Sequence, residues 1–260
     1  MNEVNKTLYI PLYGKAFVSK QGIILKDTKA EYIWKKEGFE LNGKSKSKWL
    51  AYYMGMRSAV FDTWVKEKMN MHKDAVVLHL GCGMDSRCER VQNNTYFWYD
   101  IDFEDVIKER SKYYSESDTY HMIGSNLSEL DWKQHFPGNK DAIIVMEGVS
   151  MYLTSQELID LFSNISTAFH HVYLLMDVYS EFAAKASKHK NPINDVGVHQ
   201  VYGVDDPTIL KSAGFTYLKE HDMTPMHYIN QLSKMERKVF SSLYSGKLAR
   251  NLYHLYEYEK

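Results

Sequence analysis

The chain has 260 residues and a formal net charge of −1, and 44% of its residues are apolar while 25% are charged. This composition is ordinary for a globular protein, and the length suits one large domain or, at most, a domain with a cap. A net charge close to zero argues against a general attraction to nucleic acid or to an anionic membrane surface.

The two cysteines, Cys82 and Cys88, are too few for a disulfide framework and favour a reducing compartment. They do not form a CxxC pair, which argues against a zinc site. No apolar run reaches the roughly 18 residues that a membrane span requires, and the opening residues do not resemble a signal peptide. We therefore expect a cytoplasmic protein that has no membrane partner and no bound metal.

The N-terminal part of the chain predicts helices. Residues 1–45 indicate short helices and loops, with Asp27 as the cap of a helix in DTKAEYIWKK. Residues 46–70 predict a long helix, because their apolar side chains recur at helical spacing. These side chains are Leu50, Met54, Ala59, Phe61, Val65 and Met69.

Strands and helices then alternate. Continuous apolar runs at 75–80, 95–101, 142–147 and 172–178 predict strands that are covered on both faces, as in a parallel sheet, and a shorter strand is expected at 119–124. Helices are predicted at 103–114, at 154–169 and at 207–214. The second opens with a Thr154–Glu157 capping box, and the third has Asp206 before Pro207 and ends at Gly214. This alternation predicts a doubly wound α/β fold.

The end of the chain breaks the alternation. A strand is predicted at 215–222, a helix within 230–246, and an antiparallel edge strand in 249–260, where residues alternate with period two. A parallel sheet that is finished by an antiparallel strand differs from the plain dinucleotide-binding fold. We expect one domain over residues 1–260, with residues 1–72 as an N-terminal helical segment.

A glycine turn follows the first predicted strand. Gly81 and Gly83 stand between that strand and a helix near 85–91, and Asp100 and Asp102 end the second strand. Glycines let a ligand approach the backbone closely, and a carboxylate at the end of the next strand can bind both hydroxyls of a ribose. The pattern therefore favours adenosine binding, and the alternative is a tight structural turn with a helix-capping aspartate.

Two classes of adenosine ligand fit this pattern. A dinucleotide would place its pyrophosphate at the helix N-terminus, where Asp85 would repel it. S-adenosylmethionine has a sulfonium cation and an amino-acid end, which favour nearby carboxylates and aromatic rings. Glu147 ends the 142–147 strand and Tyr152 follows it, so they supply these groups, and Asn126 with Leu127 lie in the loop after 119–124. We therefore favour S-adenosylmethionine.

The chain resembles the leucine carboxyl methyltransferase family in three blocks that occur in the same order: LHLGCGMDSR, WYDIDFEDVIKER and MEGVSMYL. The resemblance is strongest to the bacterial branch of that family, the small-molecule O-methyltransferases of the polyketide-pathway type. The upstream segments KTLYIPLYGKA and MGMRSAVFD resemble the entry segment and the arginine-bearing helix of that family. The resemblance covers most of residues 6–180. It implies a class I, Rossmann-like methyltransferase fold that uses S-adenosylmethionine.

The resemblance also implies roles for single residues. Arg57 and Lys15 would bind the donor's carboxylate, Gly81 would approach the donor, and Asp102 would bind the ribose. Asn126 and Leu127 would contact the adenine, and Glu147 would bind the amino group. Two positions depart from the family pattern: Asn126 stands where relatives often have aspartate, and Lys15 stands where the bacterial branch often has arginine. Gly83 and Asp100 complete the predicted donor site.

The chemistry of the acceptor decides whether a base is needed. A carboxylate is already ionised at neutral pH and needs none, which agrees with the lack of a Ser/His or His/Asp constellation. A phenol would need a base, for which His121 and His199 are unassigned candidates. We interpret His79 as a strand residue, and no catalytic base is assigned.

The acceptor pocket is expected between the N-terminal helices and residues 179–203, which form either a lid or a surface loop. Its candidate residues are Tyr9, Tyr13, Tyr152 and Tyr179. The sequence thus predicts an O-methyltransferase for a small-molecule carboxylate or hydroxyl. The alternatives are a protein C-terminal carboxyl methyltransferase, a dehydrogenase and a non-catalytic protein that binds an adenosine ligand. The oligomeric state stays open.

Overall fold

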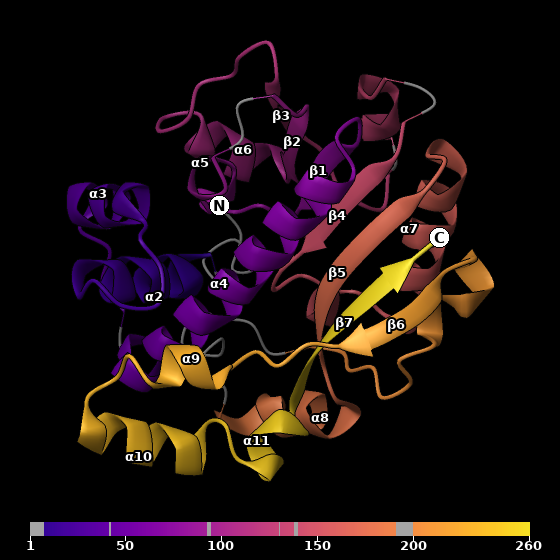
Figure 1. Cartoon of the computed structure of the whole chain (residues 1–260). Coiled ribbons are helices and arrows are strands. Elements are labelled where there is room, and N and C mark those ends of the chain that lie inside the picture. Colours follow the sequence, from indigo (N-terminus) through magenta and orange to yellow (C-terminus); the bar gives the residue numbers. More distant parts are fainter. Residues whose placement is uncertain (1–7, 42, 93–94, 130, 138–139, 191–199) are drawn as a thin grey trace.

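The computed structural model describes residues 8–41, 43–92, 95–129, 131–137, 140–190 and 200–260. Its centre is a seven-stranded sheet in the order β3-β2-β1-β4-β5-β7-β6 (Figure 1). Strands β1 to β5 are parallel, and β7 is antiparallel to both β5 and β6. The strands are β1 (Val76–Leu80), β2 (Trp98–Asp102), β3 (Tyr120–Gly124), β4 (Ala142–Met146), β5 (Val172–Tyr179), β6 (Thr216–Glu220) and β7 (Tyr253–Glu259).

Helices precede, connect and follow these strands. The α-helices are α2 (Tyr9–Lys20), α3 (Thr28–Glu37), α4 (Lys48–Met71), α5 (Arg87–Arg90), α6 (Glu104–Arg110), α7 (Ser155–Ala168), α8 (Glu181–Lys190), α9 (Met226–Ile229), α10 (Lys234–Leu243) and α11 (Lys247–Arg250). The 3₁₀ helices are η1 (Gly43–Lys46), η2 (Asp131–His135), η3 (Ser150–Tyr152) and η5 (Ile209–Ala213).

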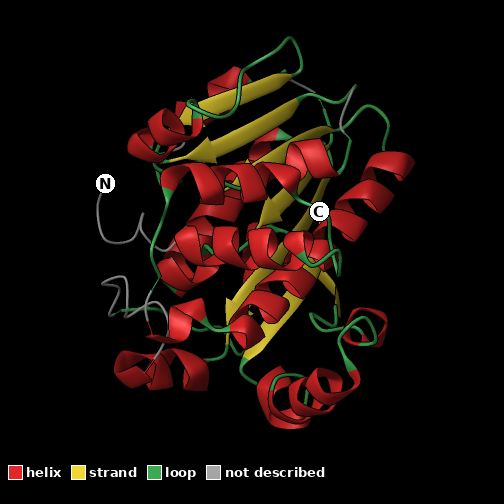
Figure 2. Ribbon diagram, turned by 90° about the vertical axis from the view of Figure 1, so that its left-hand side faces the viewer, coloured by secondary structure: helices red, strands yellow, loops and turns green. Residues whose placement is uncertain are grey.

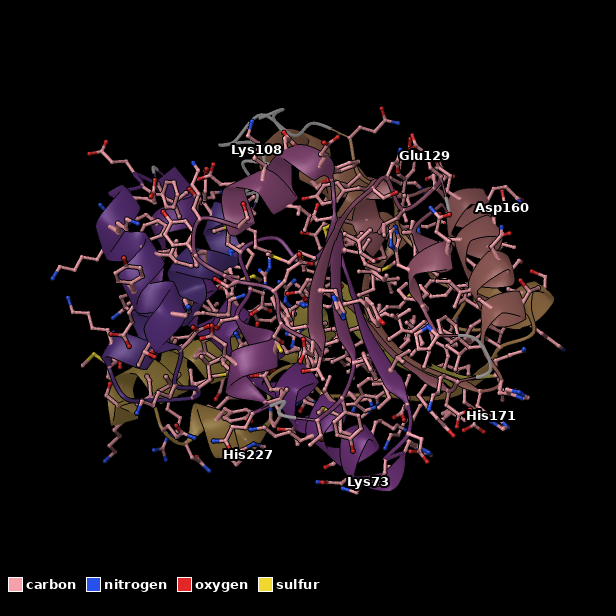
Figure 3. The ribbon with its side chains drawn as sticks, turned by 90° about the horizontal axis from the view of Figure 1, so that it is seen from above. Lys73, Lys108, Glu129, Asp160, His171 and His227 are labelled. Atoms are coloured by element: carbon pink, nitrogen blue, oxygen red, sulfur yellow. The ribbon has the colours of Figure 1, made fainter. Side chains whose placement is uncertain are left out.

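Both faces of the sheet are covered, as the continuous apolar strands predicted. Phe61 and Trp64 of α4 pack with Val77 and Ile143 on one face. The side chains of α7 pack with the alternate strand residues on the other face. Seen from the side of α2 and α3, the helices lie in front of the sheet (Figure 2). Charged side chains such as Lys108 and Asp160 lie at the periphery of the molecule (Figure 3).

Several predicted elements are confirmed. The long helix is α4, and the five parallel strands lie within a few residues of the expected positions. Asp27 caps α3 by accepting a hydrogen bond of 2.8 Å from the Ala30 backbone N–H. The capping box of Thr154 and Glu157 opens α7. The expected α/β architecture with N-terminal helices and an antiparallel C-terminal strand is therefore present.

The position of the last strand was predicted wrongly. Strand β7 is antiparallel, as expected, but it lies between β5 and β6 rather than at the edge. Both of its faces are covered, because Leu255, Tyr256 and Tyr258 are buried. The polar member of the alternation, Glu257, is buried as well and pairs with Lys68 at 2.8 Å. The alternation of apolar and polar residues in this strand therefore arises from a buried carboxylate that is paired with a lysine. It does not mark a strand edge that faces solvent.

The helix predicted at 207–214 is also different. The chain forms the 3₁₀ helix η5, which begins at Ile209. The Asp206 carboxylate accepts hydrogen bonds from the Thr208 N–H at 2.8 Å and the Thr208 hydroxyl at 2.7 Å, which makes a local turn in place of a helix cap. Gly214 ends the element in the left-handed region, at φ +88°, as predicted.

Candidate functional site

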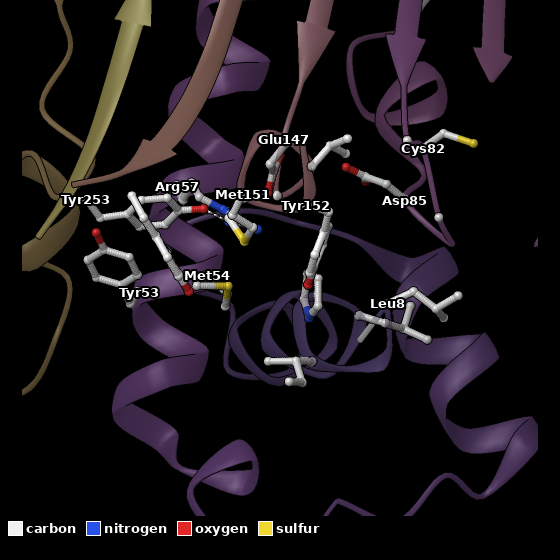
Figure 4. A pocket seen from close by; sticks show the side chains of 18 of the residues that line it. Leu8, Tyr53, Met54, Arg57, Cys82, Asp85, Glu147, Met151, Tyr152 and Tyr253 are labelled. Carbon is white, nitrogen blue, oxygen red and sulfur yellow. Dashed lines mark hydrogen bonds and ion pairs between the residues drawn. The ribbon is translucent and has the colours of Figure 1, made fainter. Parts of the chain in front are cut away.

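A cavity of about 760 Å³ lies at the carboxyl ends of the parallel strands, where sheets of this kind bind ligands (Figure 4). One side, the strand-end wall, is made by residues that end or follow β1 to β4. It includes Gly81, Gly83, Asp85, Asp102, Asn126 and Glu147. The other side, the helical wall, comes from α2, α4, α8 and α10. It includes Ile10, Lys15, Leu50, Tyr53, Met54, Arg57, Phe182 and Leu243.

The glycine turn of the strand-end wall has a backbone that favours glycine at two positions, and one of them has no room for a side chain. Gly81 has a φ of +66°, and a Cβ at this residue would lie 2.2 Å from Cγ2 of Val149. Gly83 has a φ of +50°, and its N–H donates a hydrogen bond of 2.7 Å to Oδ2 of Asp102. Positive φ values and this close approach both explain why glycine is required in the turn.

Asp102 is the carboxylate that faces this turn. Its second oxygen accepts a hydrogen bond of 2.8 Å from the Phe103 N–H. Burial raises the pKa of Asp102 to about 6, and the two backbone hydrogen bonds oppose that rise only in part. The side chain is therefore ionised at neutral pH and able to accept further hydrogen bonds.

The other member of the acidic doublet, Asp100, does not line the cavity. It lies two residues deeper in β2, fully buried, and pairs with Arg110. It also accepts hydrogen bonds from the Tyr120 hydroxyl at 2.6 Å and the Trp98 indole N–H at 2.8 Å. These contacts place it in the core beneath the turn, so the structure does not bring it to the predicted site.

A buried ionic cluster joins the two walls. On one side of the cavity Lys15 lies 3.3 Å from Asp85. On the other, Arg57 pairs through Nε with Glu147 at 3.0 Å and through Nη1 with Asp177 at 2.9 Å. Two helices thus contribute basic groups to carboxylates of the strand ends.

Arg87 strengthens this cluster and was missed in the sequence. It is fully buried, pairs with Glu147, and reaches Asp62 of α4 at 2.8 Å. Burial alone would raise the pKa of Glu147, but Arg57 and Arg87 hold it at about 2. Arg87 stands inside the LHLGCGMDSR block, so the motif itself was the signal.

Asp177 and Tyr253 were missed for different reasons. Asp177 stands near the end of a predicted strand, as Glu147 does, so the same reasoning would have found it. Tyr253 is the first residue of β7, and it lines the cavity beside Arg57. Nothing in the sequence indicated this position, because it depends on where β7 enters the sheet.

The remaining predicted donor residues lie where they were expected. Lys15, Arg57, Gly81, Gly83, Asp102, Asn126, Leu127 and Glu147 all line the cavity. The side-chain oxygen of Asn126 accepts a hydrogen bond of 3.1 Å from the Ser128 N–H. Eight residues from six segments of the chain therefore meet around one space.

The four candidate tyrosines divide into two pairs. Tyr152 and Tyr179 line the cavity, but Tyr9 and Tyr13 are not among its lining residues. The ring of Tyr9 stacks on Phe39 with centroids 3.9 Å apart. Tyr13 packs at 5.1 Å against Trp34, and its hydroxyl donates to the Lys46 carbonyl. Both belong to the face of α2 that packs against its neighbouring segments.

Among the residues that the structure describes, His79 is the only histidine that lines the cavity. His79 lies in β1, as predicted, and is buried between Asp100 at 3.2 Å and the Arg87 guanidinium, 3.2 Å from Nε2. Because arginine only donates, Nε2 accepts and the proton lies on Nδ1; burial lowers the pKa of His79 further. His121 is in β3 and stacks on Tyr99, and His199 lies outside the described residues.

The segment predicted as a lid or loop begins with helix α8. Phe182, Ala183 and Ser187 of this helix line the cavity. Residues 191–199 lie outside the described residues, so the closure of a lid stays a prediction. In the ranges that the structure describes, no helix is long and apolar enough to cross a membrane, and no three His, Cys, Asp or Glu side chains gather to hold a metal ion.

Several known proteins are similar to this chain in sequence. The family model of leucine carboxyl methyltransferase matches residues 3–166. The tetracenomycin polyketide synthesis O-methyltransferase TcmP of Streptomyces glaucescens is 26% identical over 259 residues, covering 98% of this chain and 96% of TcmP. The S-adenosyl-L-methionine-dependent methyltransferase dpfgK of Gibberella zeae is 24% identical over 184 residues, covering 65% of this chain and 62% of that protein.

A solved structure supports the fold. Magnesium protoporphyrin IX methyltransferase (ChlM) from Synechocystis PCC 6803 superposes with a TM-score of 0.53 at 12% identity, covering 90% of this chain and 94% of that one. The predicted class I methyltransferase fold is therefore confirmed. With a family model that matches more than half of its length, the chain belongs to the leucine carboxyl methyltransferase family and is an S-adenosyl-L-methionine-dependent methyltransferase.

Proposed function

We propose that the chain is an O-methyltransferase that methylates a carboxylate or hydroxyl oxygen of a small molecule. The observation that carries this proposal is the cavity, in which a polar strand-end wall faces a largely apolar helical wall. Two ligands of different chemistry fit such a space side by side. The relative TcmP, an O-methyltransferase of polyketide synthesis, supports the same class of acceptor.

The strand-end wall suits the methyl donor. Asp102 would accept hydrogen bonds from the ribose hydroxyls, and Asn126 with Leu127 would contact the adenine. Gly81 and Gly83 line the cavity without side chains, so the donor could approach their backbone closely. The carboxylate of Asp85, which follows the turn and lines the cavity, would repel a phosphate, and this agrees with a ligand that has none.

The ionic cluster suits the amino-acid end of the donor. That end carries one positive and one negative group, and the cluster offers Glu147 beside Arg57, with Lys15 nearby. Charge-assisted hydrogen bonds of this kind are about twice as strong as neutral ones. Lys15 and Arg57 already pair with carboxylates of the protein. The donor would therefore bind to a network whose side chains are held in place before it arrives.

The helical wall indicates the kind of acceptor. Among the described lining residues from α2, α4, α8 and α10, only Lys15 and Arg57 are charged, and both are directed to the strand-end carboxylates. The rest of that wall favours an acceptor with an apolar body. Both ring nitrogens of His79 are engaged, which favours an acceptor that needs no base, namely a carboxylate.

The chain's own contribution to methyl transfer is binding and orientation. When bound, S-adenosylmethionine supplies an activated methyl group. The residues of the two walls would hold donor and acceptor in line and keep water away from them, which lowers the entropic part of the barrier. Tyr152, which follows β4, and Tyr179, the last residue of β5, also line the cavity and would position the acceptor.

Two expectations from the sequence stay proposals. We infer a single domain over residues 1–260, in which the helices of the first 72 residues form one side of the cavity. We also infer that the protein works in the cytoplasm, in line with two cysteines that are both free thiols in the structure.

The first test is calorimetric titration with S-adenosylmethionine and with S-adenosylhomocysteine. Binding of both is expected, and no binding to folded protein would contradict the donor site. The enzyme is then incubated with donor and matched pairs of small carboxylic acids and the corresponding alcohols or phenols. We expect methyl esters, which mass spectrometry detects and mild alkali removes, whereas methyl ethers survive.

The alternatives give other outcomes in the same assay. Methylation of peptides at their C-terminal carboxylate, without reaction of small acids, would favour a protein methyltransferase. Binding of the donor with no product from either class of acceptor would favour a non-catalytic binding protein.

A further inference from the structure

Tyr253 stands where the two walls of the cavity meet. It is the first residue of β7, and its hydroxyl lies 2.6 Å from Nη1 of Arg57 (Figure 4). The same hydroxyl donates a hydrogen bond to Asp177. Because a guanidinium can only donate, the phenol oxygen accepts a hydrogen bond from Arg57 and uses its own hydrogen to donate to the carboxylate.

Asp177 is the anchor of this arrangement. It is fully buried near the end of β5, and its other oxygen accepts a hydrogen bond of 2.7 Å from the Gly148 N–H. Arg57 itself reaches Asp177 at 2.9 Å. The carboxylate thus fixes the loop after β4, the Arg57 guanidinium and the Tyr253 hydroxyl at once. Three hydrogen bonds to one buried charge satisfy it and make the geometry stiff.

The ring of Tyr253 is held as firmly as its hydroxyl. Tyr179 packs edge-on against it with centroids 4.7 Å apart, and Tyr53 stacks on it at 6.2 Å. The Arg57 guanidinium carbon lies 5.8 Å from the ring centroid. Burial also raises the pKa of the Tyr253 phenol, so the hydroxyl keeps its proton at neutral pH and continues to donate to Asp177.

We propose that Tyr253 and Asp177 are positioning residues for the methyl donor: they fix the Arg57 guanidinium in the orientation that receives the donor's amino-acid carboxylate. This inference rests on the proposed role of Arg57. Both residues lie beyond residue 166, where the match to the family model ends, so they extend the donor site into the C-terminal part of the chain. A rotamer locked by its neighbours loses less entropy when it binds a ligand.

The test separates the two ends of the donor. The full chain is titrated with S-adenosylhomocysteine, which has the amino-acid end, and with 5′-methylthioadenosine, which lacks it. In Tyr253→Phe, which keeps the ring, we expect S-adenosylhomocysteine to bind about three- to tenfold more weakly, the range for one hydrogen bond, and 5′-methylthioadenosine to bind as in the wild type. Asp177→Asn should show the same selective loss.

The matched control is Tyr258→Phe. Tyr258 is buried in the same strand, and its hydroxyl makes no hydrogen bond within the described residues. Both probes should bind this variant unchanged. If Tyr253→Phe lowers the affinity for both probes equally, Tyr253 has only a structural role. If the affinity for both probes is unchanged, Tyr253 does not position Arg57. Either result overturns the inference but leaves the donor site intact. Failure of the wild-type protein to bind S-adenosylhomocysteine would overturn the proposed function itself and this inference with it.

Discussion

The two walls of the cavity are built in different ways. The strand-end wall consists of backbone turns and short polar side chains whose places follow from the register of β1, β2 and β4. The helical wall gathers apolar side chains from four helices that lie far apart in the sequence. Under the proposed function, the contrast teaches that the carboxyl ends of the strands would recognise the donor, whereas the packing of the helices over them would select the acceptor. Arg57 belongs to the helical wall but forms an ion pair with Glu147 of the strand-end wall.

The largest expected effect comes from removing that link. Arg57→Ala leaves Glu147 and Asp177 buried without their shared cation. We expect the free energy of unfolding to fall by about 3–5 kcal/mol, the usual cost of breaking a buried ion pair on one side, and donor affinity to fall by about 1.5–3 kcal/mol. Denaturant unfolding and calorimetry measure the two effects.

Lys48→Ala is the control on the same helix. Lys48 pairs with Glu236 at the surface, so its loss should cost no more than about 1 kcal/mol. Equal stability of the two variants would show that the ionic cluster does not join the walls.

A smaller effect is expected from filling the glycine turn. Gly81→Ala would place a Cβ at a φ of +66° and 2.2 Å from the stiff, β-branched side chain of Val149. Strain and overpacking together should lower the free energy of unfolding by about 2–4 kcal/mol and weaken donor binding.

Gly38→Ala separates the two causes. Gly38 has nearly the same φ, +63°, but nothing lies within 4 Å of a Cβ there, so only the backbone cost of about 1–2 kcal/mol remains. If Gly81→Ala lowers the free energy of unfolding by no more than Gly38→Ala does, the close approach to Val149 does not contribute to the cost of the substitution.

The third prediction concerns pH and the strand-end wall alone. Asp102 has a pKa of about 6, above its ordinary value of 3.8, so it gains a proton as the pH falls through about 6. Under the proposed function, protonation would remove an acceptor for the ribose hydroxyls, and S-adenosylhomocysteine affinity should therefore fall by roughly tenfold per pH unit below that value. Titrations between about pH 5 and about pH 8 test this. Asp102→Asn should bind weakly at every pH, and a flat profile in the wild type would contradict the role of the carboxylate.

The smallest effect belongs to the helical wall. Phe182 lines the cavity although 67% of its surface is exposed. Phe182→Ala should raise the KM for an acceptor found in the methylation assay several-fold, by about 1 kcal/mol for one partly buried ring, and leave S-adenosylhomocysteine affinity unchanged. Leu248→Ala, at an exposed residue that is not among those lining the cavity, should change neither quantity. A change in donor affinity for Phe182→Ala would mean that the two walls do not act separately.

This contrast also explains what the sequence could predict. Gly81, Asp102 and Glu147 could be predicted because each ends or follows an apolar run that the sequence shows to be a strand. Tyr9 and Tyr13 were placed wrongly because α2 has apolar residues on more than one side, and periodicity does not say which side faces a cavity. The period-two pattern of β7 indicated an antiparallel strand, but a pattern within one strand contains no information about its neighbours. The partners of β7 follow only from long-range packing.

The insertion of β7 has a consequence for how the chain folds. Strand β6 precedes β7 in the sequence, yet it joins the sheet only by pairing with β7. During synthesis β6 must therefore wait for the residues from Tyr253 onward before it finds its partner. Pairing of β5 with β7 closes a loop of more than seventy residues, an event of high contact order that slows folding. Amide hydrogens of β6 should thus gain protection from exchange later than those of β1 and β4.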